Sequence, residues 1–273
     1  KKIELDVSVP TDGEYVLTLS FVLREDTPWA KRGHEVAYGQ EVLGHMPEAV
    51  PSARPYQVTR GWHNVGVKGQ DFEVLFSILH GGLVSYRYGG VELFKSIPKP
   101  NFWRALTDND VANLLPFRAG QWKIASMYSS FKYEHGRAAT DCTIDEAENH
   151  VTITYTYHLP VKPQMDCQVA YSVYGDGEVK VAMTMDPSAE VGELPEYSML
   201  FTMDADYDNL TWYGLGPEET YVDKCHAKLG LYSNKVADNM AKYLVPQECG
   251  NKVGVRYAKV TDEKGRGLLF RGD

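Results

Sequence analysis

The sequence lacks any apolar run of about 18 residues, which is the length that a membrane-spanning helix requires. It also lacks a leader pattern after Lys1 and any cluster of Lys and Arg residues. The net charge of its 273 residues is −9, whereas nucleic-acid-binding proteins usually present a basic face. We therefore expect neither a membrane nor a nucleic acid as a partner.

Metal-binding spacings are missing as well. The four cysteines are scattered and none belongs to a CxxC pattern (Cys142, Cys167, Cys225 and Cys249). The eight histidines show no HxH or HExxH pattern. Widely spaced single cysteines are typical of reduced thiols, so the sequence predicts a cytoplasmic location and no metal site.

Helical periodicity is scarce, and only residues 117–127 place apolar side chains at spacings of three and four. Alternating apolar and polar residues are common instead, and 18 tyrosines favour β structure. Two such alternations, 3–9 and 15–23, flank a turn and predict a hairpin, and a third predicted strand covers 34–43. These patterns predict an all-β fold of antiparallel strands.

The chain divides into three parts. Residues 46–64 hold Pro47, Pro51 and Pro55 without an apolar period, which predicts an extended linker. The three strands of 1–45 bury too little apolar surface to be stable alone, so we expect this part to be a fragment. Strand patterns spaced about 8–12 residues apart predict a large antiparallel sandwich at 65–273. Its predicted strands are 72–79, 83–88, 91–94, 131–136, 138–146, 150–159, 165–174, 178–185, 198–203, 210–214, 252–261 and 267–271.

The segment PNFWRALTDND, residues 100–110, is too polar for a plain strand. Phe102 and Trp103 have large flat side chains that favour burial. The triplet Asp108-Asn109-Asp110 has the turn and helix-capping chemistry that ends an extended segment, and Arg104 can pair with one of the aspartates. An oxygen-rich turn of this kind also suits a hard cation.

A second polar segment, WYGLGPEETYVDK, covers residues 212–224. Gly214 and Gly216 allow tight backbone turns. Several of the side chains that follow can bind a hydroxyl-rich ligand, and they can equally form surface pairs such as one between Asp223 and Lys224. The binding candidates of this segment are Glu218, Glu219, Tyr221 and Asp223.

Together the two segments resemble the C-terminal, small-chain region of bacterial lacZ-type β-galactosidases of glycoside hydrolase family 2, where similar segments follow in the same order. Weaker collinear similarities lie at 72–88, 195–202 and 242–257, so the resemblance covers most of 70–273. It implies a galactose mutarotase-like β-supersandwich at 65–273, truncated at its C-terminal end. It also implies that 1–45 is the C-terminal part of an immunoglobulin-like domain.

The resemblance implies no catalytic residue in this chain. Retaining glycosidases need two carboxyl groups about 5 Å apart, and the family carries them on a TIM barrel of about 200 residues or more that precedes the immunoglobulin-like domain. The resemblance implies a non-catalytic region that contributes to assembly with the remaining domains, to active-site shaping and to carbohydrate binding. It further implies a galactoside ligand, a homo-oligomeric full enzyme, and Mg and Na sites largely outside this region.

Seven residues become candidates for carbohydrate binding or active-site shaping: Trp103, Arg104, Asp108, Asn109, Asp110, Glu219 and Tyr221. Purely structural roles stay open for all of them, as does a cation site at 108–110. Two other functions also stay open, a lectin-like carbohydrate-binding domain and a free-standing mutarotase-like aldose epimerase. The epimerase requires a histidine and a carboxylate that face one cleft within 70–273.

Overall fold

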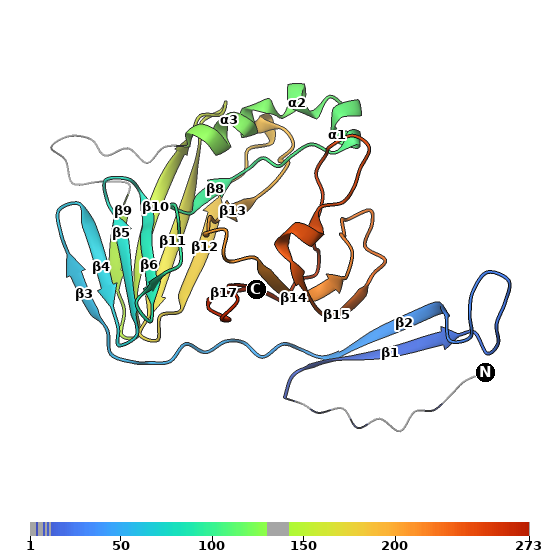
Figure 1. Cartoon of the computed structure of the whole chain (residues 1–273). Coiled ribbons are helices and arrows are strands. Elements are labelled where there is room, and N and C mark those ends of the chain that lie inside the picture. The colour runs from blue at the N-terminus through green and yellow to red at the C-terminus, as the bar shows by residue number, and fades with distance from the viewer. Residues whose placement is uncertain (1–3, 5–7, 9, 11, 130–141, 273) are drawn as a thin grey trace. The chain divides into compact units, whose positions relative to one another are not determined.

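The computed structural model describes residues 4, 8, 10, 12–129 and 142–272 (Figure 1). Antiparallel sheets make up most of this part of the chain, and helices are few, so the all-β prediction is confirmed. Most of the predicted strand at 3–9, all of the one at 131–136 and the start of the one at 138–146 lie outside the described residues. None of the described helices is long and apolar enough to cross a membrane.

The chain forms two compact units: unit 1 contains residues 1–49, 208–241 and 249–273, and unit 2 contains 50–207 and 242–248. These units follow contacts in space, whereas the division at 45 and 64 follows the sequence, and that division stays a prediction. The linker predicted at 46–64 contains one strand, β3 (Gln57–Arg60), because its residues pair with β4 (Asn64–Lys68).

Unit 2 is built on two larger sheets. One has the order β3-β4-β5-β6-β7, with β5 at Phe72–Ser77, β6 at Gly82–Tyr88 and β7 at Val91–Glu92. The other has the order β12-β11-β10-β9, with β9 at Cys142–Glu146, β10 at His150–Leu159, β11 at Met165–Tyr174 and β12 at Val179–Met185. A short pair, β8 (Lys99–Asn101) and β13 (Ser198–Leu200), and the 3-10 turn η1 (Ala189–Val191) complete it.

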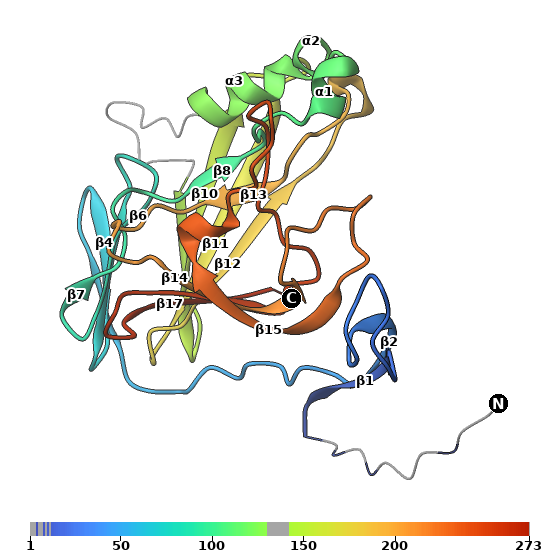
Figure 2. The same ribbon diagram turned by 45° about the vertical axis from the view of Figure 1, so that its right-hand side comes forward.

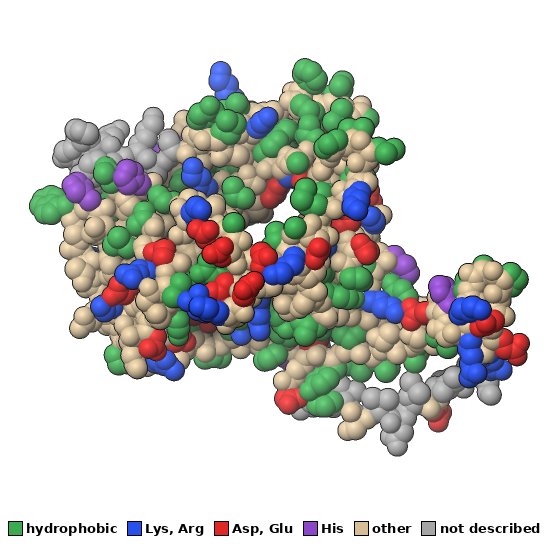
Figure 3. Space-filling view, viewed as in Figure 1, with side chains coloured by type: hydrophobic (Ala, Val, Ile, Leu, Met, Phe, Trp, Pro, Cys, Tyr) green, Lys and Arg blue, Asp and Glu red, His purple; other side chains and the backbone are tan. Residues whose placement is uncertain are grey.

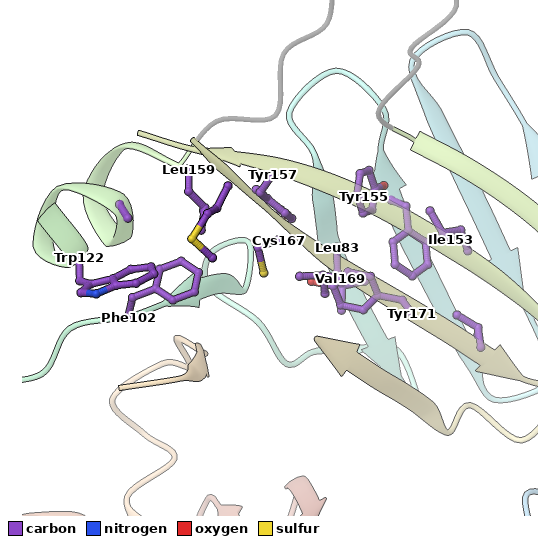
Figure 4. Packing of buried hydrophobic residues seen from close by; sticks show 14 of the residues in the cluster. Leu83, Phe102, Trp122, Ile153, Tyr155, Tyr157, Leu159, Cys167, Val169 and Tyr171 are labelled. Atoms are coloured by element: carbon purple, nitrogen blue, oxygen red, sulfur yellow. The ribbon is translucent and has the colours of Figure 1, made fainter. Parts of the chain in front are cut away.

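The core of unit 2 lies where the two larger sheets contribute alternate side chains (Figure 4). Every second residue of β10 is buried, as the period of two predicts. Buried tyrosines reach across with their hydroxyl groups: Tyr157 donates to the Gly81 carbonyl at 2.8 Å. These hydrogen bonds join the sheets while satisfying a polar group in the core.

Three short helices lie together at one end of β10–β12 (Figures 1 and 2): α1 (Asp108–Ala112), α2 (Leu115–Arg118) and α3 (Gly120–Tyr128). The sequence predicts one helix at 117–127, and the structure divides it at Ala119. Trp122 and Ala125 of α3 are buried, and the Trp122 ring lies 5.6 Å from that of Phe102. This contact fixes the helices to the segment that leads into them.

Unit 1 contains a hairpin, β1 (Glu14–Val22) with β2 (Glu35–Gly44), and a sheet of order β15-β14-β16-β17. The sheet consists of β14 (Asn209–Gly216), β15 (Lys228–Lys235), β16 (Tyr257–Thr261) and β17 (Gly267–Arg271), and the turn η2 (Val236–Asn239) follows β15. The strand β15 is absent from the sequence-based prediction. Glu14 of the hairpin binds Arg256 at 3.0 Å and accepts the Tyr213 hydroxyl at 2.8 Å, which joins the hairpin to this sheet.

Candidate functional site

The segment at 100–110 begins with a buried anchor. Phe102 is fully buried, and its backbone N–H donates to the Ser126 hydroxyl at 2.8 Å. Trp103 is half-buried and packs against the same core. Asn101 donates its side-chain amide to the Trp103 carbonyl at 2.9 Å, so the backbone is held on both sides of the aromatic pair.

Arg104 and Asp110 form a two-pronged ion pair, with Nη1–Oδ2 at 2.5 Å and Nη2–Oδ1 at 3.3 Å. The Asp110 carboxylate also accepts the Thr107 N–H at 2.8 Å, and the Thr107 hydroxyl accepts the Asp110 N–H at 3.2 Å. Thr107 is therefore the N-cap of α1, and the Asp108-Asn109-Asp110 triplet, predicted to cap or end the segment, occupies the first helical turn.

These contacts set the charge state of Asp110. Burial alone would raise the pKa of its carboxyl, but the hydrogen bonds from Arg104 and Thr107 outweigh burial and hold the pKa below its usual range. The pKa of Arg104 is raised in turn, chiefly by its hydrogen bond to Asp110. The pair is consequently ionised at neutral pH and fixes the segment rather than offering a reactive group.

Asp108 and Asn109 are exposed at the start of α1. Asp108 is joined to Gln247 by two hydrogen bonds, one from its N–H to Oε1 at 2.9 Å and one from Nε2 to its carboxylate at 3.3 Å. The Glu248 N–H donates to the Leu106 carbonyl at 3.0 Å. Residues 242–248 are thus fastened along the polar segment of unit 2.

The side chain of Glu248 adds a carboxyl group that sequence reasoning missed. Burial raises the pKa of Glu248, Arg104 opposes that rise, and the Glu196 and Asp110 carboxylates add to it. Three carboxyl groups therefore act electrostatically on one guanidinium, and Asp110 is the one that binds it directly. Glu196 and Glu248 lie far from 100–110 in the sequence, and no local pattern marks them.

The second segment, in unit 1, is also fixed by internal bonds. Glu219 is buried, and its carboxylate accepts the Lys224 ammonium at 2.9 Å and the Gly250 N–H at 2.9 Å. Lys224 is thereby paired with Glu219, whereas the sequence suggests a pair with Asp223. Tyr221 is half-buried and forms an antiparallel bridge with Lys224.

A lysine lies over the tryptophan that begins this segment. The Lys252 ammonium is 5.0 Å from the centre of the Trp212 ring. Burial lowers the pKa of Lys252, whereas the Glu218 and Glu219 carboxylates oppose that change. The ammonium of Lys252 therefore lies over a buried indole and near two carboxylates, an arrangement that stabilises the segment.

The seven predicted residues fall into two groups. Five lie in unit 2, where Arg104 and Asp110 are paired and Asp108 and Asn109 are exposed; Glu219 and Tyr221 lie in unit 1. No group of three or more metal-ligating side chains that could hold an ion occurs in the described ranges, and the predicted absence of a cofactor stays untested. A histidine and a carboxylate do meet at His158 and Asp166, 2.8 Å apart, but on a partly exposed strand face rather than in a cleft.

Comparisons with known proteins agree with the resemblance. A family model described as "Beta galactosidase small chain" matches residues 68–271, and one described as "Beta-galactosidase, domain 4" matches 1–44. The β-galactosidase of Halalkalibacterium halodurans is 37% identical over 97% of this chain and 26% of its own length. That of Priestia megaterium is 41% identical over 95% of this chain and 25% of its own.

A further relative is the "Beta-galactosidase small subunit" of Latilactobacillus sakei, 33% identical over 68% of this chain and 62% of the relative. The chain spans about a quarter of the length of the two relatives named before it. Because the first family model covers most of the sequence and two long relatives are 37% and 41% identical over nearly all of it, the chain belongs to the β-galactosidase small-chain family.

Proposed function

We propose that the chain is a non-catalytic, C-terminal region of a glycoside hydrolase family 2 enzyme that hydrolyses terminal β-D-galactosides. In this role it associates with the remaining domains and shapes the active site that they carry. The observation that carries the proposal is the fixed state of its carboxylates. Asp110 is bound by Arg104 and Thr107, and Glu219 by Lys224 and Gly250.

A retaining nucleophile needs a carboxylate oxygen that is free to attack the sugar, with a second carboxyl group about 5 Å away as the acid. The Asp110 and Glu219 carboxylates instead use both of their oxygens in internal contacts, Asp110 with Arg104 and Glu219 with Lys224 and the Gly250 N–H. The same contacts suit a supporting role, in which fixed backbone presents other groups at a constant position.

The groups presented in this way are the exposed side chains of Asp108 and Asn109. Their oxygen and amide groups are those that bind sugar hydroxyls, and we assign them to a galactoside or to the rim of the active site. The proposal includes Mg and Na sites that lie largely outside this region and a full enzyme that is a homo-oligomer. A cytoplasmic location completes the proposal.

A chimera tests this role. The region of the Priestia megaterium β-galactosidase that matches this chain is replaced by the chain itself, and hydrolysis of a chromogenic galactoside is measured. We expect an active chimera in which Asp108→Ala and Asn109→Ala raise KM, by about tenfold if each loses one sugar hydrogen bond. Glu148→Ala, at an exposed position of the β9–β10 turn, is the matched control and should leave KM unchanged.

An inactive but folded chimera would contradict the assembly role. Unchanged KM values in an active chimera would leave assembly in place and remove the sugar-binding role of Asp108 and Asn109.

A further inference from the structure

The helical cap of unit 2, residues 108–128, exposes apolar side chains on its outer side. Its inner side is buried in the core through Leu115, Ala119, Trp122 and Ala125. The space-filling view shows hydrophobic side chains gathered over α1–α3 at the top of the molecule (Figure 3). The exposed members are Val111, Leu114, Phe117, Ile124, Met127 and Tyr128.

Three of these side chains lie at the junction of α1 and α2. The Leu114 N–H donates to the Val111 carbonyl at 3.1 Å, and the Phe117 N–H donates to the Leu114 carbonyl at 3.0 Å. Phe117 is 85% exposed, which is unusual for a phenylalanine without a binding partner.

The other three lie along α3. Ile124, Met127 and Tyr128 are spaced by three and four residues and therefore share one face of the helix. Trp122 and Ala125 occupy the opposite, buried face. A helix that is apolar on both sides is normally covered on both sides, and this one is covered on its inner side by unit 2 itself.

The backbone of the cap carries strain at the same place. Leu114 adopts φ 57 and ψ 31, the left-handed region that a leucine rarely enters. Its side chain is nevertheless 57% exposed and gains little from packing within unit 2. Strained residues of this kind concentrate at functional surfaces, where a partner compensates the cost.

The charged side chains of the cap limit which partner surfaces can bind it. Residues 111–128 contain two charged side chains, Arg118 and Lys123, both basic, in a chain of net charge −9. Arg118 is already paired with Glu193. The partner surface that fits the cap is therefore apolar at its centre and accommodates basic side chains of the cap at its edge. The exposed aromatic rings of Phe117 and Tyr128 are typical of the anchors of an interface.

We propose that the outer face of the helical cap is the docking surface for the large portion of a β-galactosidase. This inference rests on the proposed function. That occupant is favoured over a second copy because about three quarters of the length of the two long relatives lies outside the region that matches this chain. The cap also continues from the polar segment whose Asp108 and Asn109 we assign to the active-site rim.

Binding in solution tests the inference. The Priestia megaterium β-galactosidase is shortened to remove the region that matches this chain, and the Kd between the shortened enzyme and the whole chain is measured. The double variant Phe117→Ser, Met127→Ser should raise Kd by about 100-fold, since anchors of an interface each contribute tenfold or more. Both side chains are exposed, so circular dichroism and thermal melts should match the parent.

Trp62→Ser is the matched control, because Trp62 lies in unit 2 outside the cap and is 91% exposed. It should change Kd less than about twofold. A double variant that binds as tightly as the parent would overturn the docking surface and leave the proposed function in place. A parent chain that does not bind, while the relative's own matching region does, would overturn both.

Analytical sedimentation of the chain alone tests whether a second copy of the chain binds the cap instead. A dimer that forms in micromolar solution and is lost in the double variant, with unchanged binding to the shortened enzyme, would assign the cap to a second copy and overturn the inference.

Discussion

At the scale of single residues, the structure depends most on how Asp110 is held. Its carboxylate accepts hydrogen bonds from Arg104 and from the Thr107 N–H, and its pKa is held below the usual range. A carboxyl whose pKa is lower in the folded than in the unfolded state adds stability above its unfolded pKa of about 3.9 and loses it as the pH falls through the folded value.

We therefore expect the parent chain to lose stability below about pH 4, and Asp110→Asn to lose less over that window. At pH 7 the same substitution should lower the free energy of unfolding by about 1–3 kcal/mol, because a charged hydrogen-bond partner of Arg104 is removed. Urea denaturation at several pH values measures both effects. Equal pH profiles for the two proteins would contradict the role of the pair.

Glu248 should show the opposite dependence of stability on pH. Burial raises its pKa, so its ionised form is disfavoured in the folded state. Its contribution to stability is therefore lost as the pH rises through its pKa in the folded state. Glu248→Gln should leave the unfolding free energy unchanged near pH 4 and increase it slightly at pH 7. A decrease at pH 7 in the same denaturation experiment would show that the carboxylate is stabilising instead.

The sequence predicts part of this residue-level picture. Arg104 is close to the aspartates in the chain, so a pair between them can be expected, and the structure selects Asp110. Glu196 and Glu248 reach the same guanidinium only through the tertiary fold. Glu219 can be named from its segment, but its bond to the Gly250 N–H depends on a loop that no spacing in the sequence indicates.

At the scale of elements, the anchor of the helical cap is the contact between Phe102 and Trp122. Phe102 is fully buried, whereas Trp103 is half-buried. Phe102→Ala should lower the free energy of unfolding by about 3–5 kcal/mol because it leaves a cavity. Trp103→Ala should cost less, and thermal melts rank the two. The reverse order would show that Trp103 carries the anchor.

Strand prediction succeeds where one face of a strand is buried and the other face is exposed to solvent. The strands β10 and β11 have the bounds predicted from their alternation, because one face is buried and the other meets solvent. The strand β15 escapes prediction because Gly230 and the polar Ser233-Asn234 pair interrupt its short alternation of Leu229 and Leu231. The division of the predicted helix at Ala119 follows from packing against the core, which helical spacing does not record.

At the scale of the whole molecule, unit 1 joins segments that are distant in the sequence. Burial tends to raise the pKa of Glu14, yet the hydrogen bonds from Tyr213 and Arg256 lower it overall, so the half-buried carboxylate is ionised. Arg256→Met would leave that charge without its cation and should cost about 1–3 kcal/mol, the loss expected for a charged hydrogen bond. Lys228→Met, which breaks the more exposed pair with Glu35, should cost much less.

Hydrogen exchange of the β1 amides measures this difference. Fast exchange in Arg256→Met and slow exchange in Lys228→Met would confirm that the Glu14 pair holds the hairpin. Equal protection in the two variants would mean that the hairpin is held by other contacts.

The family and the all-β class can be predicted from the sequence because two long polar segments and many short alternations mark them. The make-up of unit 1 cannot be predicted in this way, since the unit combines segments from the first and last parts of the sequence with residues 208–241. The central claim is that such a chain supports a galactosidase without performing its chemistry.

The most direct test is a reconstitution assay with a chromogenic galactoside. The purified chain, the shortened Priestia megaterium β-galactosidase that lacks the matching region, and their mixture are assayed in parallel. We predict no turnover by the chain alone and turnover by the mixture that saturates near equal amounts of the two parts. Turnover by the chain alone that is lost on Asp108→Ala or Asp110→Ala would contradict it.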